Sequence, residues 1–203
     1  MRERAQVGMS LYGPTGNRKY LNAAERRRFI RAALRAPHDV KLFSLVLILS
    51  GGRISEILAL TPAAIDIDSG ATNITTLKRR KRGIVRQVPL PHSVICELNH
   101  LFHLRRRQRD PEYARRRMWT WSRTTAWRRV KEVMTDAKIN GTPAMPKGLR
   151  HGFGVHAIQS KIPMPLLQRW LGHASLRTTA IYIDVVDADE RAIAARMWSR
   201  SLK

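Results

Sequence analysis

Apolar and polar positions repeat with helical spacing over most of the chain, and one interval near the middle departs from it. Asn22 followed by Glu25 is a capping-box pattern, which predicts the start of the first helix. Gly51 and Gly52 end the second helix, and helical spacing resumes directly after them, so Arg53 lies at a helix start. The spacing predicts helices at about residues 21–34, 39–50, 53–60, 93–107, 122–137, 147–161, 164–173, 176–185 and 188–198.

The exceptional interval has the spacing of β-strands. IDID (65–68), ITTLK (74–78) and IVRQVPLP (84–91) are predicted to be short strands, and the intervening RRKRG is the turn between the last two. A loop rich in Arg and Trp is expected at about residues 107–121. The sequence therefore predicts a mainly α fold with a small antiparallel β-sheet, an α+β class.

Several residues are predicted to lie in the core because of their place in the apolar pattern. Cys96 falls in the apolar-periodic stretch VICELNHLF, and as the single cysteine it has no partner for an internal disulfide. Trp127, Trp170 and Trp198 fall in apolar-periodic helices. All four are therefore expected to be packing residues.

The first twenty residues differ from the rest of the chain. Residues 1–20 are basic and lack periodicity, so they are expected to form a flexible arm outside the core. Residues 21–203 are expected to form one domain, for which a hydrophobic content of 43% is ample.

The charge of the chain indicates the class of its partner. The net charge is +23 and the isoelectric point is about 11.6, so a polyanion is expected, with double-stranded DNA as the leading candidate. The longest apolar run, residues 42–49, is much shorter than the roughly 20 residues of a membrane span, and the N-terminal stretch lacks the apolar segment of a secretory signal. We therefore expect a cytoplasmic, nucleoid-associated protein without a membrane partner.

Two arginine motifs stand in a fixed order. GGRISEILAL resembles the first catalytic-arginine motif of the tyrosine recombinases, the phage integrase family, and Arg53 matches its arginine. KGLRHGF resembles the second, with Arg150 on the arginine and His151 on the histidine that follows. Lys147 stands where the family most often has histidine. It is kept as a site residue because it can still donate to phosphate, but a general-base role at that position is in doubt.

A third motif completes the resemblance. LGHASLRTTAIY resembles the segment that joins a Leu-Gly-His turn to two threonines and the nucleophilic tyrosine, here His173, Thr178, Thr179 and Tyr182. The resemblance covers about residues 20–190 and implies the integrase catalytic-domain fold and site-specific recombination. It implies cleavage of one DNA strand at a time through a covalent 3′-phosphotyrosine link, within a homotetramer on synapsed sites.

The residue types suit this chemistry. Cleavage of a phosphodiester adds charge to its non-bridging oxygens, and the planar guanidinium groups of Arg53 and Arg150 are suited to clamp them. Metal-dependent nucleases instead need clustered carboxylates, whereas the fifteen acidic residues here are scattered, so no metal or other cofactor is expected. The exception is the run DVVDADE (184–190), which is expected to cap the last helix and to form its acidic first turn. Tyr182 needs nearby positive charge or a base because a free phenol has a pKa of about 10, and Arg53, Arg150 and His173 are expected to provide it.

The leaving hydroxyl also needs a proton. In the family a lysine of the strand-turn-strand element supplies it, and Lys78 and Lys81 are the candidates. Lys78 ends the first strand, whereas Lys81 lies in the turn, so Lys78 is favoured and Lys81 stays open. Glu56 is expected to orient Arg53. For His151 two roles stay open, a buried, hydrogen-bonded support and a reactive group, and it is kept as a secondary candidate.

Three functions remain as alternatives at this point. Site-specific recombination leads, and a topoisomerase of the IB class or a noncatalytic DNA-binding protein are the others. Family members often carry a separate N-terminal DNA-clamping domain, but only about twenty residues precede the first predicted helix here. A minimal recombinase and a piece of a longer chain are therefore both open, and a minimal enzyme would use its basic arm, the hairpin and the region from Arg105 to Arg117 to hold DNA.

Overall fold

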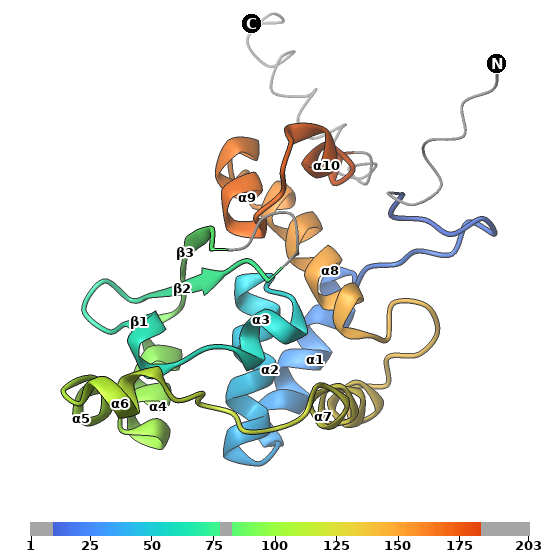
Figure 1. The fold of residues 1–203 in the computed structure, drawn as a ribbon. Helices are drawn as coiled ribbons and strands as arrows, with labels where there is room; N and C mark the ends of the chain where they lie inside the picture. The colour runs from blue at the N-terminus through green and yellow to red at the C-terminus, as the bar shows by residue number, and fades with distance from the viewer. Residues whose placement is uncertain (1–9, 78–82, 184–203) are drawn as a thin grey trace, which may run out of the picture.

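The computed structural model describes residues 10–77 and 83–183, and most of them are helical (Figure 1). Asn22 forms both bonds of the predicted capping box at the start of the first helix. The left-handed Gly51 ends the second, and Arg53 is the N-cap of the third, as predicted. The described helices are α1 (Ala23–Arg35), α2 (His38–Ser50), α3 (Ile54–Leu58), the 3-10 helix η1 (Pro62–Ala64), α4 (His92–Phe102), α5 (Leu104–Gln108), α6 (Pro111–Arg115), α7 (Arg123–Asp136), α8 (Pro146–Gln159), α9 (Met164–Leu171) and α10 (Leu176–Ala180).

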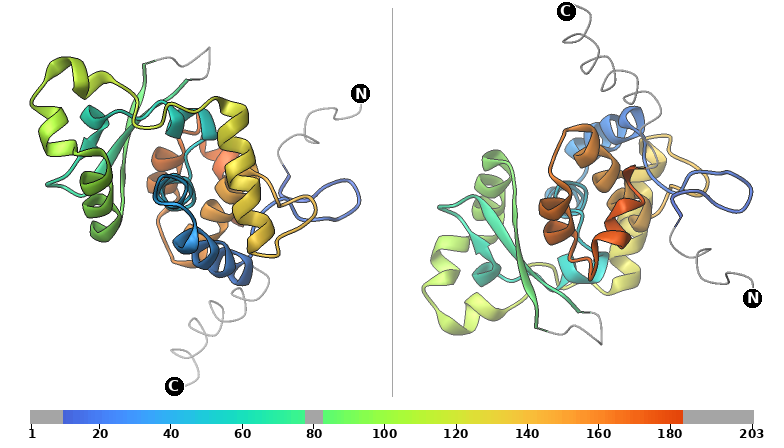
Figure 2. Two further views of the ribbon diagram at one scale, coloured as in Figure 1. Left: turned by 90° about the horizontal axis from the view of Figure 1, so that it is seen from below. Right: turned by 90° about the horizontal axis from the view of Figure 1, so that it is seen from above.

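The sheet has three antiparallel strands in the described part of the chain, in the order β1, β2, β3. They are β1 (Ile65–Asp66), β2 (Ala71–Thr75) and β3 (Val85–Pro89). The longer pairing runs from Ala71 opposite Pro89 to Thr75 opposite Val85. The sheet and α4–α6 lie together at one side of the molecule, away from α7 (Figures 1 and 2). The predicted fold class, mainly α with a small antiparallel sheet, is confirmed.

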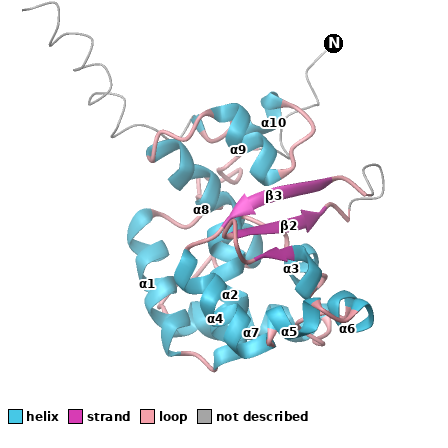
Figure 3. Cartoon of the chain, turned by 90° about the vertical axis from the view of Figure 1, so that its left-hand side faces the viewer, coloured by secondary structure: helices cyan, strands magenta, loops and turns pink. Residues whose placement is uncertain are grey.

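Two hydrophobic clusters form the core, and α8 contributes to both. The larger cluster takes side chains from α1 to α5, α7 and the sheet, and Leu149 of α8 completes it. The smaller cluster joins Phe153 and Val155 of α8 to Leu167, Leu171 and Tyr182. It lies where α9 and α10 pack over one end of α8 (Figure 3).

The segment before α1 is not wholly outside the core. Leu11 and Tyr20 are 2% and 8% exposed and belong to the smaller cluster. The chain between them folds back on itself, because the Lys19 N–H donates to the Leu11 carbonyl at 2.8 Å, and Arg18 forms an ion pair with Glu25. The expectation that residues 1–20 lie outside the core is therefore wrong for Leu11 and Tyr20, while residues 1–9 lie outside the described part.

Two predictions about the core are also wrong. Cys96 is exposed, because α4 buries Val94, Ile95 and Leu98 on its other face and leaves the cysteine beside His92. Trp127 is 44% exposed on α7, where the buried face is formed by other residues. Apolar periodicity marks a helix, and a side chain at the edge of the apolar stripe can fall on either face.

Three further expectations have mixed outcomes. The predicted loop at 107–121 contains the short helix α6, whose N-cap Asp110 accepts from the Glu112 and Tyr113 backbone N–H groups. Trp170 is partly buried against both clusters, while Trp198 and the predicted helix at 188–198 lie outside the described residues.

Among the described residues, no helix has the length and apolar character needed to cross a membrane.

Candidate active site

Arg53 is held at the N-terminus of α3 by the carboxylate of Glu56, as predicted from the sequence. Its backbone N–H donates to Glu56 Oε2 at 2.9 Å, and its Nη1 donates to Glu56 Oε1 at 2.7 Å. The Arg53 side chain is 39% exposed, whereas that of Glu56 is 2% exposed. The buried carboxylate therefore fixes a guanidinium group that still faces solvent.

Arg150 is fixed by two backbone carbonyls at the ends of other helices. Nη1 donates to the Gly51 carbonyl after α2 at 2.7 Å, and Nη2 donates to the Leu171 carbonyl of α9 at 2.6 Å. Burial, and next the charge of Arg53, lowers the pKa of Arg150 to about 10. The side chain therefore still carries its charge at neutral pH, in a place that disfavours charge.

Tyr182 is almost fully buried directly after α10. Its ring stacks against that of His173, with centroids 6.2 Å apart and an interplanar angle of 11°. Its hydroxyl lies 3.2 Å from Nδ1 of His151. Burial raises the pKa of Tyr182, and the charges of Arg150 and Arg53 oppose that rise. The phenol is therefore neutral at neutral pH in this state of the molecule.

His173 follows the left-handed Gly172 and contacts α10, the helix that precedes Tyr182. Its Nδ1 lies 3.0 Å from Thr179 Oγ1, and Thr179 is fully buried. Burial, followed by the charges of Arg150 and Arg53, lowers the pKa of His173 to about 3. His173 and Tyr182 therefore face the two arginines as neutral groups, and His173 does not supply the positive charge that was expected of it.

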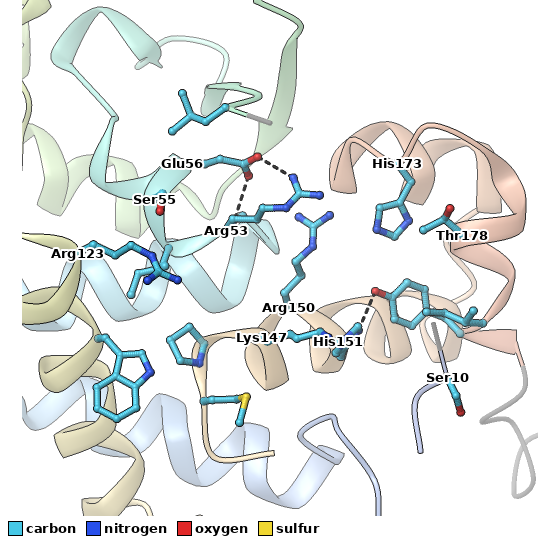
Figure 4. Close-up of a pocket in the computed structure, with 18 residues that line it drawn as sticks. Ser10, Arg53, Ser55, Glu56, Arg123, Lys147, Arg150, His151, His173 and Thr178 are labelled. Atoms are coloured by element: carbon cyan, nitrogen blue, oxygen red, sulfur yellow. Dashed lines mark hydrogen bonds and ion pairs between the residues drawn. The ribbon is translucent and has the colours of Figure 1, made fainter. Parts of the chain in front are cut away.

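These side chains line one cleft with a volume of about 710 Å³ (Figure 4). In Figure 4 the guanidinium groups of Arg53 and Arg150 lie side by side and face His173. The cleft brings together five of the six predicted site residues: Arg53, Lys147, Arg150, His173 and Tyr182. The sixth, Lys78, and its alternative Lys81 lie outside the described residues. Leu77, which precedes Lys78, lines the cleft.

Sequence reasoning missed several residues of this cleft. Ser10, Arg123, Trp127 and Met145 line it, although none belongs to a motif. His151 was given only a secondary place, and its Nδ1 lies 3.2 Å from the Tyr182 hydroxyl oxygen. Among residues 10–77 and 83–183, no three His, Cys, Asp or Glu side chains gather in the way that metal ligands would.

The two histidines predict how stability changes with pH. Burial, and next the charge of Lys147, lowers the pKa of His151 to about 4, and that of His173 is lowered to about 3. The unfolded chain takes up protons near pH 6.5 and the folded chain does not, so stability is full above that pH and falls as the pH drops. The melting temperature of a His151→Gln protein is therefore expected to fall less between pH 6.5 and pH 5 than that of the wild type.

The exposed His100 on α4 provides the control for that measurement. A His100→Gln protein is expected to keep the wild-type dependence of melting temperature on pH, because this side chain lies on the surface. Melting would be followed by circular dichroism above pH 5, where most ordinary carboxylates stay ionised. Equal slopes for wild type and His151→Gln would contradict the assignment.

The chain is similar in sequence to known proteins. The model of the phage integrase family matches residues 19–189. Tyrosine recombinase XerA of Pyrococcus furiosus is 33% identical over 184 residues, which are 86% of this chain and 62% of that protein. Tyrosine recombinase XerD of Shewanella oneidensis is 31% identical over 145 residues, 68% of this chain and 47% of that protein.

Solved structures share the fold. The crystal structure of XerA recombinase has a TM-score of 0.69 and 25% identity over 88% of this chain and 64% of that chain. A post-cleavage complex of XerH site-specific recombinase with difH substrate has a TM-score of 0.71 and 21% identity over 89% of this chain and 53% of that chain. The chain thus spans less than two-thirds of the length of these relatives. The family match takes in most of the chain, including all five residues gathered in the cleft, and this chain therefore belongs to the phage integrase family of tyrosine recombinases.

Proposed function

We propose that this chain is the catalytic domain of a site-specific DNA recombinase that cuts and rejoins strands through Tyr182. The observation that carries the proposal is the meeting of three distant motifs in one cleft, where Arg53, Arg150 and His173 surround the tyrosine. A cationic cleft of this kind suits a phosphodiester whose charge grows during cleavage. Family membership adds the expectation of a homotetramer on synapsed sites, acting in the cytoplasm at the nucleoid.

In the proposed reaction, the Tyr182 oxygen attacks the scissile phosphorus. A bond forms between that oxygen and phosphorus, and the bond from phosphorus to the 5′ oxygen breaks, leaving a 3′-phosphotyrosine and a free 5′ hydroxyl. Arg53 and Arg150 stabilise the charge on the non-bridging oxygens. Because the energy of the broken bond is kept in the new one, the reverse attack rejoins the strand without ATP.

Two proton movements accompany this step. The tyrosine proton leaves the hydroxyl, and the neutral Nδ1 of His151 is the ring nitrogen 3.2 Å from it. Lys147 lines the same cleft and adds positive charge near the phosphate. The 5′ oxygen receives a proton, for which the proposal keeps Lys78 with Lys81 as its alternative.

Covalent capture of DNA tests the proposal without knowledge of the target site. The chain would be incubated with a pool of nicked duplexes whose central base pairs are randomised, and denaturing gels would separate protein that carries DNA. We expect a denaturation-stable adduct enriched in a subset of sequences. Salt-sensitive binding without any adduct would overturn the proposal in favour of a noncatalytic DNA-binding protein. Adducts without sequence preference, together with relaxation of any supercoiled plasmid, would favour a topoisomerase.

Gly154 provides a separate prediction about the placement of the tyrosine. A Cβ atom at Gly154 would lie 2.5 Å from both Cε1 and Cζ of Tyr182, so the ring must move. A Gly154→Ala protein is expected to lose roughly 1–3 kcal/mol of stability through overpacking. It is expected to form the adduct about 10²-fold more slowly, because displacement of a reacting group by about 1 Å has costs of that size.

The control for Gly154→Ala is Gly13→Ala. The nearest atom to a Cβ at Gly13 is the Asn17 carbonyl oxygen at 3.5 Å, which is ordinary contact. Chemical denaturation would give the free energy of unfolding, and the capture gel would give the adduct rate. A Gly154→Ala protein with wild-type stability and rate would show that the tyrosine is not seated as described.

A further inference from the structure

Arg86 is a buried arginine on β3 that belongs to none of the three motifs. Its side chain is 3% exposed. It lies on the same face of β3 as Val88, because burial alternates along this strand. An arginine is almost never fully buried unless its charge is paired, and its N–H groups need acceptors. The partners of Arg86 therefore indicate why it is there.

Three hydrogen bonds of Arg86 join separate parts of the active site. Nε donates to the Trp170 carbonyl at 2.7 Å, Nη1 to Thr76 Oγ1 at 3.3 Å, and Nη2 to Glu56 Oε2 at 2.5 Å. The next carbonyl of α9 accepts from Arg150. Carbonyls in the last turn of a helix lack partners within the helix, so two arginines complete the C-terminus of α9.

Arg86 also contacts the segments that lead to other site residues. The Thr76 N–H donates to the Ile84 carbonyl at 2.9 Å, which closes the base of the hairpin that carries both candidate lysines. A Cβ at Gly172 would lie 3.2 Å from Arg86 Cδ, so the turn before His173 packs directly on this side chain. One arginine therefore holds the hairpin base and the histidine turn together.

The charge balance adds a second role. Glu56 pairs with Arg86 through Oε2 and with Arg53 through Oε1, so one carboxylate is shared between two guanidinium groups. The group as a whole carries one net positive charge. Without Arg86, the Arg53–Glu56 pair would be neutral, and its attraction for an anion would fall. Burial is the largest single effect on the pKa of Glu56 and raises it, but the hydrogen bonds and charges of Arg86 and Arg53 together outweigh burial, so the pKa is lowered, in keeping with an ionised carboxylate.

We propose that Arg86 is a positioning residue for cleavage, which neutralises Glu56 so that Arg53 presents its charge to the scissile phosphate, and which joins the hairpin base to the end of α9. This inference rests on the proposed function for its meaning in catalysis. Its electrostatic part, however, predicts that Arg86 strengthens the binding of any tetrahedral oxyanion in the cleft.

Paired variants separate the charge effect from a purely structural effect. An Arg86→Met protein is expected to form the adduct with the nicked-duplex pool about 10²-fold more slowly. Adding Glu56→Gln removes the neutralising carboxylate, so the double variant is expected to be about tenfold faster than Arg86→Met. An Arg86→Lys protein keeps the charge and is expected to lie between wild type and Arg86→Met. A structural role alone predicts no recovery in the double variant, because the bonds to Thr76 and Trp170 are missing from both.

A matched control is Arg28→Met. Nε of Arg28 donates to the Ala137 carbonyl at 3.0 Å and ties α1 to the end of α7, and Arg28 does not line the cleft. It is expected to keep the wild-type adduct rate. Melting temperatures of every variant would identify any that do not fold.

Tungstate binding, measured by calorimetry, keeps the inference separate from the proposed function. Tungstate binding that is lost in Arg53→Met is binding in the cleft. Arg86→Met is expected to lower the affinity of this binding about tenfold, and the double variant Arg86→Met, Glu56→Gln is expected to recover it. If the wild type forms no adduct, the proposed function fails, and the tungstate result still decides the inference. Equal tungstate affinity in wild type and Arg86→Met, absence of an Arg53-dependent component, or no recovery in the double variant would overturn it.

Discussion

A Tyr182→Phe protein is expected to bind DNA as tightly as the wild type and to form no covalent adduct. The substitution removes the attacking oxygen, so no bond to phosphorus can form, whereas the basic surface that attracts phosphates is unchanged. Within the described part of the chain the hydroxyl makes one hydrogen bond, with His151, so the loss of stability is expected to be about 0.5–1.5 kcal/mol. Gel-shift affinity, the melting temperature and the capture gel would be measured on one preparation.

Tyr113→Phe is the matched control for that substitution. Tyr113 is 46% exposed on α6 and does not line the cleft, so its hydroxyl has no part in the proposed reaction. This control is expected to keep the wild-type amount of adduct. A Tyr182→Phe protein that still captured DNA would place the nucleophile elsewhere and remove the basis of the proposed mechanism.

An Arg150→Met protein is expected to lose about 10²- to 10³-fold in adduct rate while remaining folded. The rate falls because a fixed cationic donor to the phosphate is lost, and removal of such donors has costs of this order. Burial, and next the charge of Arg53, lowers the pKa of Arg150 to about 10. This shift corresponds to a free-energy cost of roughly 3 kcal/mol for the charged form of the guanidinium group at this buried position. Methionine fills similar space without that charge.

The stability of Arg150→Met depends on two opposing effects. Removing the buried charge relieves the desolvation cost, but the Gly51 and Leu171 carbonyls lose their donor, at about 1–3 kcal/mol each. The free energy of unfolding is therefore expected to stay within about 3 kcal/mol of the wild-type value. An unfolded variant would show that Arg150 is mainly structural, and a folded variant with an unchanged adduct rate would contradict its catalytic role.

Local motifs in the sequence predicted which side chains gather in the cleft. Helix starts and glycine breaks located Arg53, because the N-terminus of α3 is set by local capping. The three motifs named the arginines, the histidine and the tyrosine that share the cleft. A sequence motif does not give the distances between side chains. The contact between His151 and the Tyr182 hydroxyl is therefore known only from the structure.

Residues outside the motifs depend on packing between distant segments. Arg86 lies in the predicted strand 84–91 on the face of Val88 and Leu90, and a charge on that apolar face was the one available signal. Leu11 is buried because α8 and α9 form a second cluster that accepts it, a long-range event that periodicity within residues 1–20 cannot express. Cys96 shows the opposite case, since an apolar neighbourhood in sequence left it exposed.

The most direct test of the central claim is to identify the residue that carries DNA. The captured adduct would be digested with nuclease and protease, and mass spectrometry would locate the remaining nucleotide on a peptide. The account predicts that the nucleotide is linked through its 3′ phosphate to Tyr182. A nucleotide on Tyr12, Tyr20 or Tyr113, or on a residue other than tyrosine, would contradict it.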